Sequence, residues 1–472
     1  MSRGKDLVKN TGILFVAKTS TQVVSFFLLP LYTALLSTKE YGQLDIYYSL
    51  VMILMPVITL QLEQAIFRFL ISVNEEEIIS SVITSALYTL LISFSLVSTI
   101  YIVLALLFRF EYCVPLYFYY AGIMCSTVLY QVCRGFGKNM VYGFATFLIS
   151  LITVSLNIVF VAVFKFGILG VIISTAIAHI IGSVYMILRT KAYKYVNRKY
   201  ISKVRTIEML KYSVPLIFNQ ISSWAINYSD RLIILGFLGK SMNGIYSVAN
   251  KFSNILNTFF NVFNLAWTEN VVKNIHDKDA LSYTNRIITI TIQMYFSLII
   301  GIINLLPFVF DILVNESYSE AYNHVPILLT AAVFSGLSAS LGSVYVAFKK
   351  TKNVGITTVI SGIVNIGVHF ALIYFIGLYA ASISTLVSFI ALFVYRYLNI
   401  QKFYKIKISY SKCILVFAIL IFSWIAYVVK NPILIIAGLV LNLANIAWMF
   451  LQSKAEIMSI LKRRSKNAEN KK

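Results

Sequence analysis

Polar and charged side chains recur at helical spacing inside stretches of the chain that are otherwise apolar. Charged residues lie well inside such stretches at Lys18, Glu63, Asp230, Arg231 and Lys251. An unpaired ion at the centre of a bilayer costs roughly 2.5 kcal/mol or more, so charges at that depth mark ion pairs, substrate pathways or relays. These residues predict either a water-filled, charged cavity between helices or a set of structural ion pairs.

Uncharged polar residues extend the same faces. A stripe of amides and hydroxyls along a helix indicates a wet surface or a partner helix, because lipid-facing positions should be apolar. Hydrogen bonds between helices, worth about 0.6 to 2 kcal/mol each, are the alternative for any single residue. The residues predicted to line a cavity and bind substrate are Lys18, Gln22, Gln61, Arg68, Asn219, Asn227, Arg231, Lys251, Asn254 and Asn261.

The carboxylates inside the spans are candidates for proton or sodium sites, with structural ion pairing as the alternative. They are Glu63, Asp230 and Glu269. Asp230 and Arg231 are adjacent and point about 100° apart on a helix. We expect Asp230 to pair with Lys251, which leaves Arg231 to another partner or to the cavity. His369 is a lone histidine on a polar face, more typical of a hydrogen-bonded core residue than of a proton relay.

The elements that position these residues are predicted to be transmembrane helices. Hydrophobic residues make up 59% of the 472 residues and charged residues 12%, against about 25% charged residues in soluble domains. A bilayer requires roughly 20 apolar residues per helix, and about fourteen such stretches are present. Their ranges are 11–36, 43–70, 80–107, 115–133, 140–164, 168–188, 209–236, 243–270, 284–310, 321–347, 354–376, 378–398, 411–429 and 432–451.

Positive charge is distributed according to membrane topology. The formal net charge is +22, but the basic residues lie in alternate loops rather than on one soluble face, which argues against nucleic acid as a partner. With the N-terminus inside, about 30 Lys and Arg residues lie on the cytoplasmic side and about five outside. Both termini are therefore predicted to be cytoplasmic, and the basic start, MSRGKDLVKN, precedes a retained first helix rather than a cleaved signal peptide.

The spans group into two halves. We predict a six-helix bundle at 1–188, a basic cytoplasmic linker at 189–208, a second six-helix bundle at 209–398, two extra helices at 399–451 and a basic cytoplasmic tail at 452–472. Shifting the chain by 202 residues places Leu36 on Leu238 and Gly42 on Gly244. This overlay favours an internal duplication, and such repeats commonly enclose a site near the membrane midplane.

Short motifs in both halves resemble a known family. The points of match are Pro30, the turn Glu40-Tyr41-Gly42, Arg68-Phe69, Arg134 to Lys138, Pro215, Asp230-Arg231 and Gly244-Ile245-Tyr246-Ser247. Their order and spacing resemble the polysaccharide transporter branch of the multidrug/oligosaccharidyl-lipid/polysaccharide (MOP) flippase superfamily, the Wzx-type O-antigen and capsule flippases. The resemblance covers essentially the whole chain.

The resemblance implies an all-α membrane protein that works by alternating access in the bacterial cytoplasmic (inner) membrane. Its cargo would be an oligosaccharide repeat unit on undecaprenyl diphosphate, moved to the outer leaflet with a proton or sodium counter-ion. Membrane lipids are further partners, and a polysaccharide polymerase and a chain-length protein remain open as others. No cofactor, metal or catalytic residue is predicted.

Other functions predict different features. A lipid II flippase of the same superfamily would carry a similar sugar-diphosphate lipid, whereas a drug/cation antiporter should have a more acidic cavity. A membrane enzyme such as a sugar polymerase usually needs a sizeable outer loop, and the longest outer gap, residues 311–320, is too short to fold.

Overall fold

The computed structural model describes residues 26–71, 73–275, 277 and 279–469, and within these ranges it contains helices and turns but no strand. The chain divides into two compact units. Unit 1 consists of residues 1–259 and 362–381, and unit 2 of residues 260–361 and 382–472. The prediction of an all-α membrane protein is confirmed for the described residues, eleven of whose helices are long and apolar enough to cross a bilayer.

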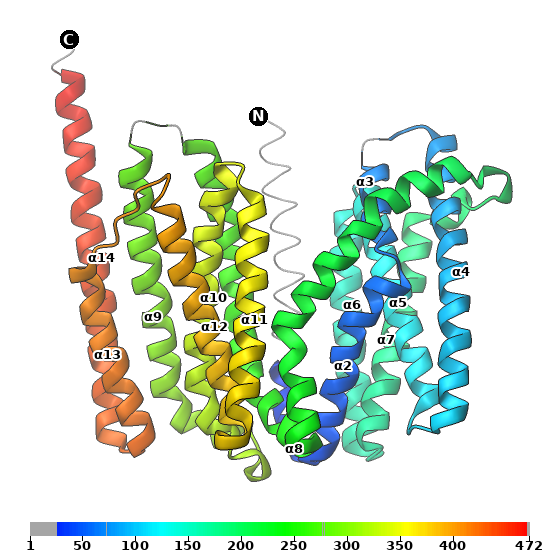
Figure 1. The fold of residues 1–472 in the computed structure, drawn as a ribbon, viewed down its shortest axis with the longest axis horizontal. Coiled ribbons are helices and arrows are strands. Elements are labelled where there is room, and N and C mark those ends of the chain that lie inside the picture. Colours follow the sequence, from blue (N-terminus) through cyan, green and yellow to red (C-terminus); the bar gives the residue numbers. More distant parts are fainter. Residues whose placement is uncertain (1–25, 72, 276, 278, 470–472) are drawn as a thin grey trace. The chain divides into compact units, whose positions relative to one another are not determined.

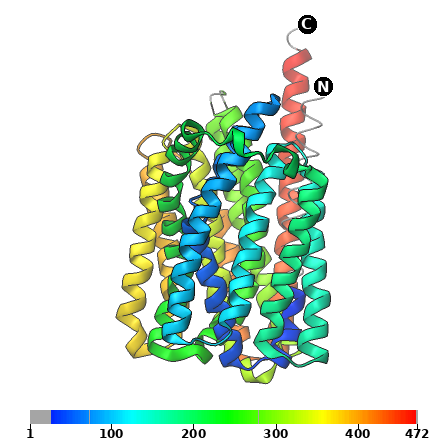
Figure 2. The same ribbon diagram turned by 90° about the vertical axis from the view of Figure 1, so that its right-hand side faces the viewer.

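Unit 1 holds the N-terminal helices and the first part of a long helix, α8. After the short apolar helix Phe26–Leu35 come α2 (Thr38–Ile58), α3 (Leu62–Leu70), α4 (Glu76–Phe108), α5 (Cys113–Gly135), α6 (Asn139–Asn157), a π-helical turn (Ile158–Val163), α7 (Gly167–Thr190), two 3₁₀ turns (Ala192–Tyr195, Arg198–Tyr200) and α8 (Lys203–Asn274) (Figure 1). α5 packs on α7, and α7 packs on α6; Figure 2 shows these helices side by side.

Unit 2 holds most of the remaining helices. They are α9 (Ala280–Leu313), a 3₁₀ turn (Glu316–Tyr318), α10 (Ala321–Ala347), α11 (Thr351–Ile376), α12 (Tyr379–Ile400), α13 (Tyr410–Val429) and α14 (Pro432–Glu469). Residues 362–381, which include the end of α11, belong to unit 1. The sequence places the spans well: the range predicted at 321–347 is that of α10.

The spans predicted at 209–236 and 243–270 together form α8, which is bent at Gly239. This glycine has φ +84° and ψ −179°, a conformation that side chains with a Cβ rarely adopt. The helical backbone therefore stops there and restarts at once. The two predicted spans are real segments, but a single residue replaces the expected loop.

The single helix predicted at 43–70 is wrong, because the backbone breaks between α2 and α3. Leu60 and Gln61 both adopt left-handed conformations, with φ of +52° and +53°. A break inside a span frees carbonyl groups that lipid cannot satisfy. Ser93 of α4 supplies one donor, since its Oγ lies 2.7 Å from the Ile58 carbonyl oxygen.

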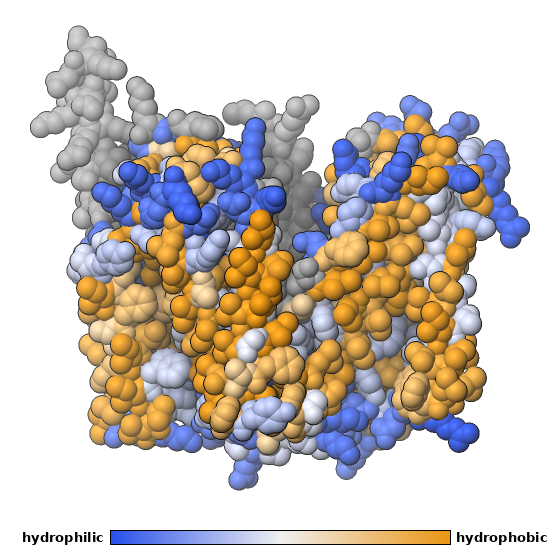
Figure 3. All heavy atoms as spheres, in the orientation of Figure 1, coloured by the Kyte–Doolittle hydropathy of each residue, from blue (hydrophilic) through white to orange (hydrophobic). Residues whose placement is uncertain are grey.

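The outer surface of the helices is suited to lipid. On the face shown in Figure 3, apolar side chains cover the middle of the helices of each unit, and hydrophilic residues gather near the helix ends. α4 illustrates this: Leu96, Leu106 and Phe108 are all more than 60% exposed. Exposed apolar area of this size is unfavourable in water and neutral in a bilayer, so the helices span a membrane.

Amide side chains hold the last two helices of unit 2 against α9. Asn304 of α9 donates to Ser423 of α13 at 2.8 Å. Asn442 and Asn445 of α14 donate to the carbonyl and hydroxyl oxygens of Ser297 at 2.9 and 3.0 Å. Hydrogen bonds between helices substitute for the hydrophobic effect, which is absent inside lipid. α13 and α14 are therefore specifically attached to unit 2.

Two glycines allow α2 and the second segment of α8 to cross in contact within unit 1. A Cβ on Gly42 would lie 1.9 Å from the Lys240 carbonyl oxygen, and a Cβ on Gly244 would lie 2.1 Å from the Thr38 carbonyl oxygen. Lys240 and Gly244 are the residues reached from Thr38 and Gly42 by the shift of 202 positions. The contact is thus reciprocal, as expected when equivalent segments of a duplicated chain meet about a two-fold axis.

Candidate functional site

The candidate site is built around the first turns of α2, whose start is fixed by its sequence. Ser37 and Glu40 form a reciprocal capping box: the Ser37 amide donates to Glu40 Oε2 at 2.9 Å, and the Glu40 amide donates to Ser37 Oγ at 3.3 Å. Such a cap satisfies amide groups that have no partner within the helix. It sets the register that places Asp45 about two turns beyond the start of α2, facing α8.

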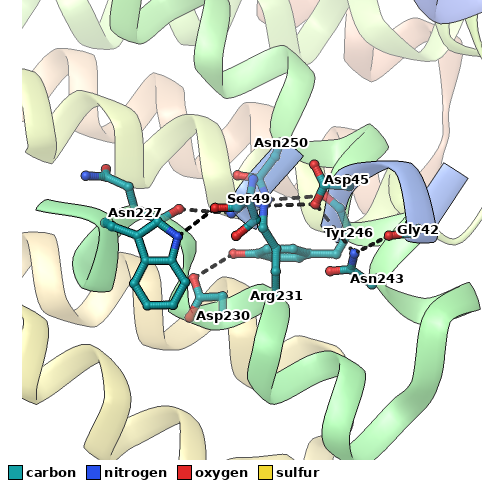
Figure 4. Close-up of polar contacts among 10 residues, drawn as sticks. Gly42, Asp45, Ser49, Asn227, Asp230, Arg231, Asn243, Tyr246 and Asn250 are labelled. Carbon is teal, nitrogen blue, oxygen red and sulfur yellow. Dashed lines mark hydrogen bonds and ion pairs between the residues drawn. The ribbon is translucent and has the colours of Figure 1, made fainter. Parts of the chain in front are cut away.

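Asp45 forms an ion pair with Arg231 of α8 in unit 1 (Figure 4). Arg231 Nε lies 2.9 Å from Asp45 Oδ2, and the Arg231 side chain is only 6% exposed. The guanidinium also donates through Nη1 to the Asn227 carbonyl oxygen at 2.9 Å. Its carbon lies 4.8 Å from the centre of the Tyr228 ring, a cation–π distance. Arg231 is therefore a neutralised, tightly held cation.

Asp230, the neighbour of Arg231, points to a different set of partners. Its Oδ2 accepts a hydrogen bond from the Tyr246 hydroxyl at 3.0 Å, and its Oδ1 lies 3.0 Å from Nδ1 of His369. His369 reaches it from α11, in the segment that belongs to unit 1. The predicted pairing of Asp230 with Lys251 stays a prediction. Lys251 lies within electrostatic range of Asp45 and Arg231.

Hydrogen bonds from side chains of α8 to the backbone of α2 tie the two helices together around these charges (Figure 4). Asn243 Nδ2 donates to the Gly42 carbonyl oxygen at 2.9 Å, and the indole nitrogen of Trp224 donates to the Ser49 carbonyl oxygen at 2.9 Å. Both acceptors are main-chain groups, so the contacts fix the spacing of the two helices rather than a side-chain geometry.

The other predicted cavity residues of α8 in unit 1 lie at its surface. Asn219, Asn227 and Asn254 are exposed, although they lie in a segment predicted to span the membrane. An exposed amide at that depth has few partners in lipid, so it marks a face directed at water, a ligand or another protein surface.

The span predicted at 43–70, which breaks between α2 and α3, holds a second, separate group of predicted residues. Glu63 is 4% exposed, and its Oε1 accepts from Gln61 Nε2 at 3.0 Å. Its Oε2 is buried and has no hydrogen-bond partner among the described residues. Arg68 is exposed in the last turn of α3. The structure thus brings Gln61 and Glu63 together and places Arg68 elsewhere on the same short helix.

The remaining predicted residues lie outside this group. Asn261 and Glu269 belong to unit 2 and are exposed, and Glu269 forms a surface ion pair with Lys273 one turn later. Lys18 and Gln22 lie outside the described residues.

Sequence reasoning missed Asp45, the partner of Arg231. Asp45 lies three residues after Gly42, at the start of the span predicted at 43–70, where an acidic residue is easily taken for part of a loop. The shift of 202 residues gave no signal for it, because it places Asp45 on Ser247, an uncharged residue.

The charges around this centre balance among the described residues. Asp45 and Asp230 supply two negative charges, and Arg231 and Lys251 supply two positive ones. Such a cluster has a lower desolvation cost than isolated ions. It can exchange a proton or an ion partner during a conformational change more readily than it can perform covalent chemistry.

Comparison with known sequences identifies the family. The sequence profile described as "Polysaccharide biosynthesis protein" matches residues 7–268, more than half of the chain. The chain belongs to this polysaccharide biosynthesis protein family. The matched region contains Asp45, Glu63, Asp230, Arg231 and Lys251, so these charged residues lie within the part of the chain that defines the membership. No curated protein sequence matches the chain.

Solved structures show the fold of this family member. A "Lipid II flippase MurJ, inward closed conformation" aligns with a TM-score of 0.68 at 14% identity over 94% of this chain and 100% of that one. An "Inward-facing conformation of a multidrug resistance MATE family transporter of the MOP superfamily" aligns with a TM-score of 0.66 at 16% identity, over 81% of this chain and 95% of that one. An outward-facing MATE transporter aligns with a TM-score of 0.57 at 15% identity, over 84% of this chain and 96% of that one.

The polysaccharide biosynthesis family and the MOP-type fold together confirm the resemblance predicted from the motifs. They support a membrane transporter or flippase rather than a catalytic enzyme. The Wzx-type cargo stays a prediction.

Proposed function

We propose that this family member is a flippase that moves an oligosaccharide repeat unit on undecaprenyl diphosphate from the cytoplasmic to the outer leaflet of the bacterial inner membrane. The observation that carries the proposal is the combination of a polysaccharide biosynthesis family match with a MOP-type helical fold. Surface polysaccharide assembly requires a lipid-linked sugar to cross the membrane, and alternating access within this fold supplies the route. Both chain termini lie in the cytoplasm in this proposal, as the distribution of Lys and Arg predicts.

The extent of the structural matches favours a lipid-linked cargo over a small drug. The lipid II flippase fold covers 94% of this chain, whereas the two MATE folds cover 81% and 84%. The last two helices, α13 and α14, are held specifically against α9, which agrees with a role for them in transport of the cargo. Lipid II also joins a sugar to a polyprenyl diphosphate, so a lipid II flippase is the second candidate function.

The polar face of α8 suits a sugar diphosphate. Exposed amides at Asn219, Asn227 and Asn254 offer donors and acceptors for hydroxyl groups. Lys251 and Arg231 lie on the same helix, and a cation attracts a diphosphate several-fold more strongly in a low-dielectric cavity than in water. We assign one diphosphate contact to Lys251, and we expect Arg231 to contribute a second when its pair with Asp45 rearranges.

Energy coupling would use a carboxylate inside the membrane, with a proton or sodium as the counter-ion. Of the predicted candidates, Glu63 and Asp230 are buried. Glu269 is exposed and already paired with Lys273. The geometry therefore favours Glu63 and Asp230 over Glu269.

Deleting the gene is expected to trap lipid-linked oligosaccharide in the cytoplasmic leaflet and to remove surface polysaccharide. The wild-type gene should restore both, and Lys251→Ala should restore less than about a tenth of the wild-type level, because it removes the charge assigned to the diphosphate. The measurement is the leaflet distribution of labelled undecaprenyl-linked sugar, read beside surface polysaccharide at equal protein expression.

Lys273→Ala provides a matched control, since it removes one positive charge from the same helix at an exposed position. It should complement fully. Surface polysaccharide that survives the deletion in a strain with no second flippase would contradict the proposal. Accumulation of peptidoglycan precursor instead of repeat unit would shift the assignment to lipid II.

A further inference from the structure

The structure describes three buried or partly buried histidines, and their contacts differ in one respect. His179 and His324 place Nδ1 beside serine hydroxyls, at 2.7 Å from Ser126 Oγ and 2.9 Å from Ser382 Oγ. His369 places Nδ1 3.0 Å from a carboxylate oxygen of Asp230. A serine hydroxyl adapts to a neutral imidazole, whereas a carboxylate also stabilises an imidazolium.

The second ring nitrogen of His369 is not used. Its side chain is completely buried, and Nε2 has no hydrogen-bond partner among the described residues. When Nδ1–H donates to Asp230, Nε2 carries a lone pair. It is the open end of a chain that runs from the Tyr246 hydroxyl through both Asp230 oxygens to the imidazole.

The described groups near this chain of hydrogen bonds have balanced formal charges. Among the described residues, the ionisable groups around it are Asp230 and Tyr246 in contact, and Arg231, Asp45 and Lys251 in the adjoining ion-pair cluster. These groups sum to zero when His369 is neutral. A proton on Nε2 would make the cluster positive by one unit, and the imidazolium charge, shared by both ring nitrogens, would keep Nδ1–H against the Asp230 carboxylate.

We propose that His369 and Asp230 form a buried proton-binding site that tunes the affinity of the transporter for an anionic cargo group. A proton from water binds the Nε2 lone pair, the Nδ1–H bond to Asp230 is kept, and no other bond breaks. Water or a rearranged acceptor must reach Nε2 in the protonated state, so uptake accompanies a conformational opening. The positive cluster then binds a diphosphate more tightly, so the proton at this site binds together with the cargo, and exchange of a counter-ion is left to Glu63. The cargo part of this inference rests on the proposed function, and the proton site itself does not.

The test compares variants of the purified full-length protein in detergent. Undecaprenyl diphosphate is titrated at pH 6 and pH 8, and binding is read from the shift in melting temperature. The wild type is expected to bind at least about fivefold more tightly at pH 6, the lower range of typical coupling between two sites. His369→Gln, which keeps a donor but cannot take the proton, should show only the dependence caused by titration of the probe itself.

Two further variants sharpen the outcome. Asp230→Asn removes one negative charge permanently, so its affinity at pH 8 should rise towards the wild-type value at pH 6. His179→Gln and His324→Gln should behave as the wild type, because their histidines face only serine. A wild-type pH dependence that persists in His369→Gln, or that disappears equally in His179→Gln or in Glu63→Gln, would overturn the inference.

The melting temperature without cargo separates the two proposals. Its pH profile between about pH 5 and 8, where histidine changes charge, should differ between the wild type and His369→Gln even if no diphosphate binds. Absence of binding to the wild type at both pH values, together with that difference, would contradict the proposed cargo and leave the proton site supported. Identical profiles would contradict the site whether or not the protein moves its cargo.

Discussion

Replacing Gly42 with alanine is expected to destabilise unit 1 by about 3 kcal/mol, at the upper end of typical overpacking costs. The new Cβ would lie 1.9 Å from the Lys240 carbonyl oxygen and 2.7 Å from the Gly244 amide nitrogen. Both obstacles are backbone atoms of α8, so no side chain can rotate away. The helices must separate, and the hydrogen bond from Asn243 to the Gly42 carbonyl would stretch with them. The melting temperature of the purified protein, with its size-exclusion profile, measures the effect.

Gly236→Ala is the matched control, because it adds the same methyl group to α8 where nothing lies within 4 Å. It should leave the melting temperature unchanged or raise it slightly, since alanine favours a helix over glycine. Gly42→Ala and Gly244→Ala act on one contact, so the double variant should cost less than the sum of the single variants. Equal melting temperatures for Gly42→Ala and Gly236→Ala would show that the helices do not meet at these glycines.

The spans were predictable because length and hydropathy are local properties of the sequence. A bilayer demands continuous apolar stretches of a fixed length, and the range predicted for α10 matches the observed helix. The sequence also predicts a gap between the spans at 209–236 and 243–270, and Gly239 lies within it. The conformation that joins those spans into one bent helix was not predictable, because it depends on a single residue's φ angle.

The break at Leu60 and Gln61 could not be inferred from the pattern. Neither residue is glycine or proline, and Pro56 lies inside α2, several residues before the break. The break is stabilised in part by a contact from another helix, the Ser93 hydroxyl on the Ile58 carbonyl. Local propensity gives no warning when a contact from another helix decides the backbone.

The candidate site was predictable by residue type and only partly by partner. The sequence singled out Asp230, Arg231 and Lys251 as charges too deep to leave unpaired, and all three lie in or beside the cluster. The pairing of Arg231 with Asp45 joins residues 186 positions apart. Helical periodicity relates residues on one helix and is silent about which second helix faces them, so that partner required the structure.

Removing either member of the Asp45–Arg231 pair is expected to destabilise the protein by about 3 to 5 kcal/mol, because the remaining charge would be buried without its partner. The two single variants should not be equal. Without Arg231, Asp45 keeps Lys251 within electrostatic range and the amide of Asn243 at 3.5 Å. Without Asp45, Arg231 and Lys251 repel each other. Asp45→Ala should therefore lower the melting temperature more than Arg231→Ala.

A neutral pair separates a structural role from a role in transport. Asp45→Asn with Arg231→Gln removes both charges and keeps polar groups able to bond across the helices, so its stability should return to within about 1 kcal/mol of the wild type. If the pair served stability alone, transport would return as well. We expect it not to return, because the proposed cargo needs the guanidinium once the pair rearranges.

The readouts are the melting temperature and the leaflet distribution of the lipid-linked sugar in complemented cells. A stable but inactive neutral pair would assign the Arg231 charge to the cargo, and it would remove the ambiguity of Arg231→Ala, which loses charge and stability together. A neutral pair that is as unstable as Asp45→Ala would contradict the ion pair itself. A neutral pair that transports at the wild-type rate would restrict Arg231 to holding α2 against α8, and would leave Lys251 as the α8 cation assigned to the diphosphate.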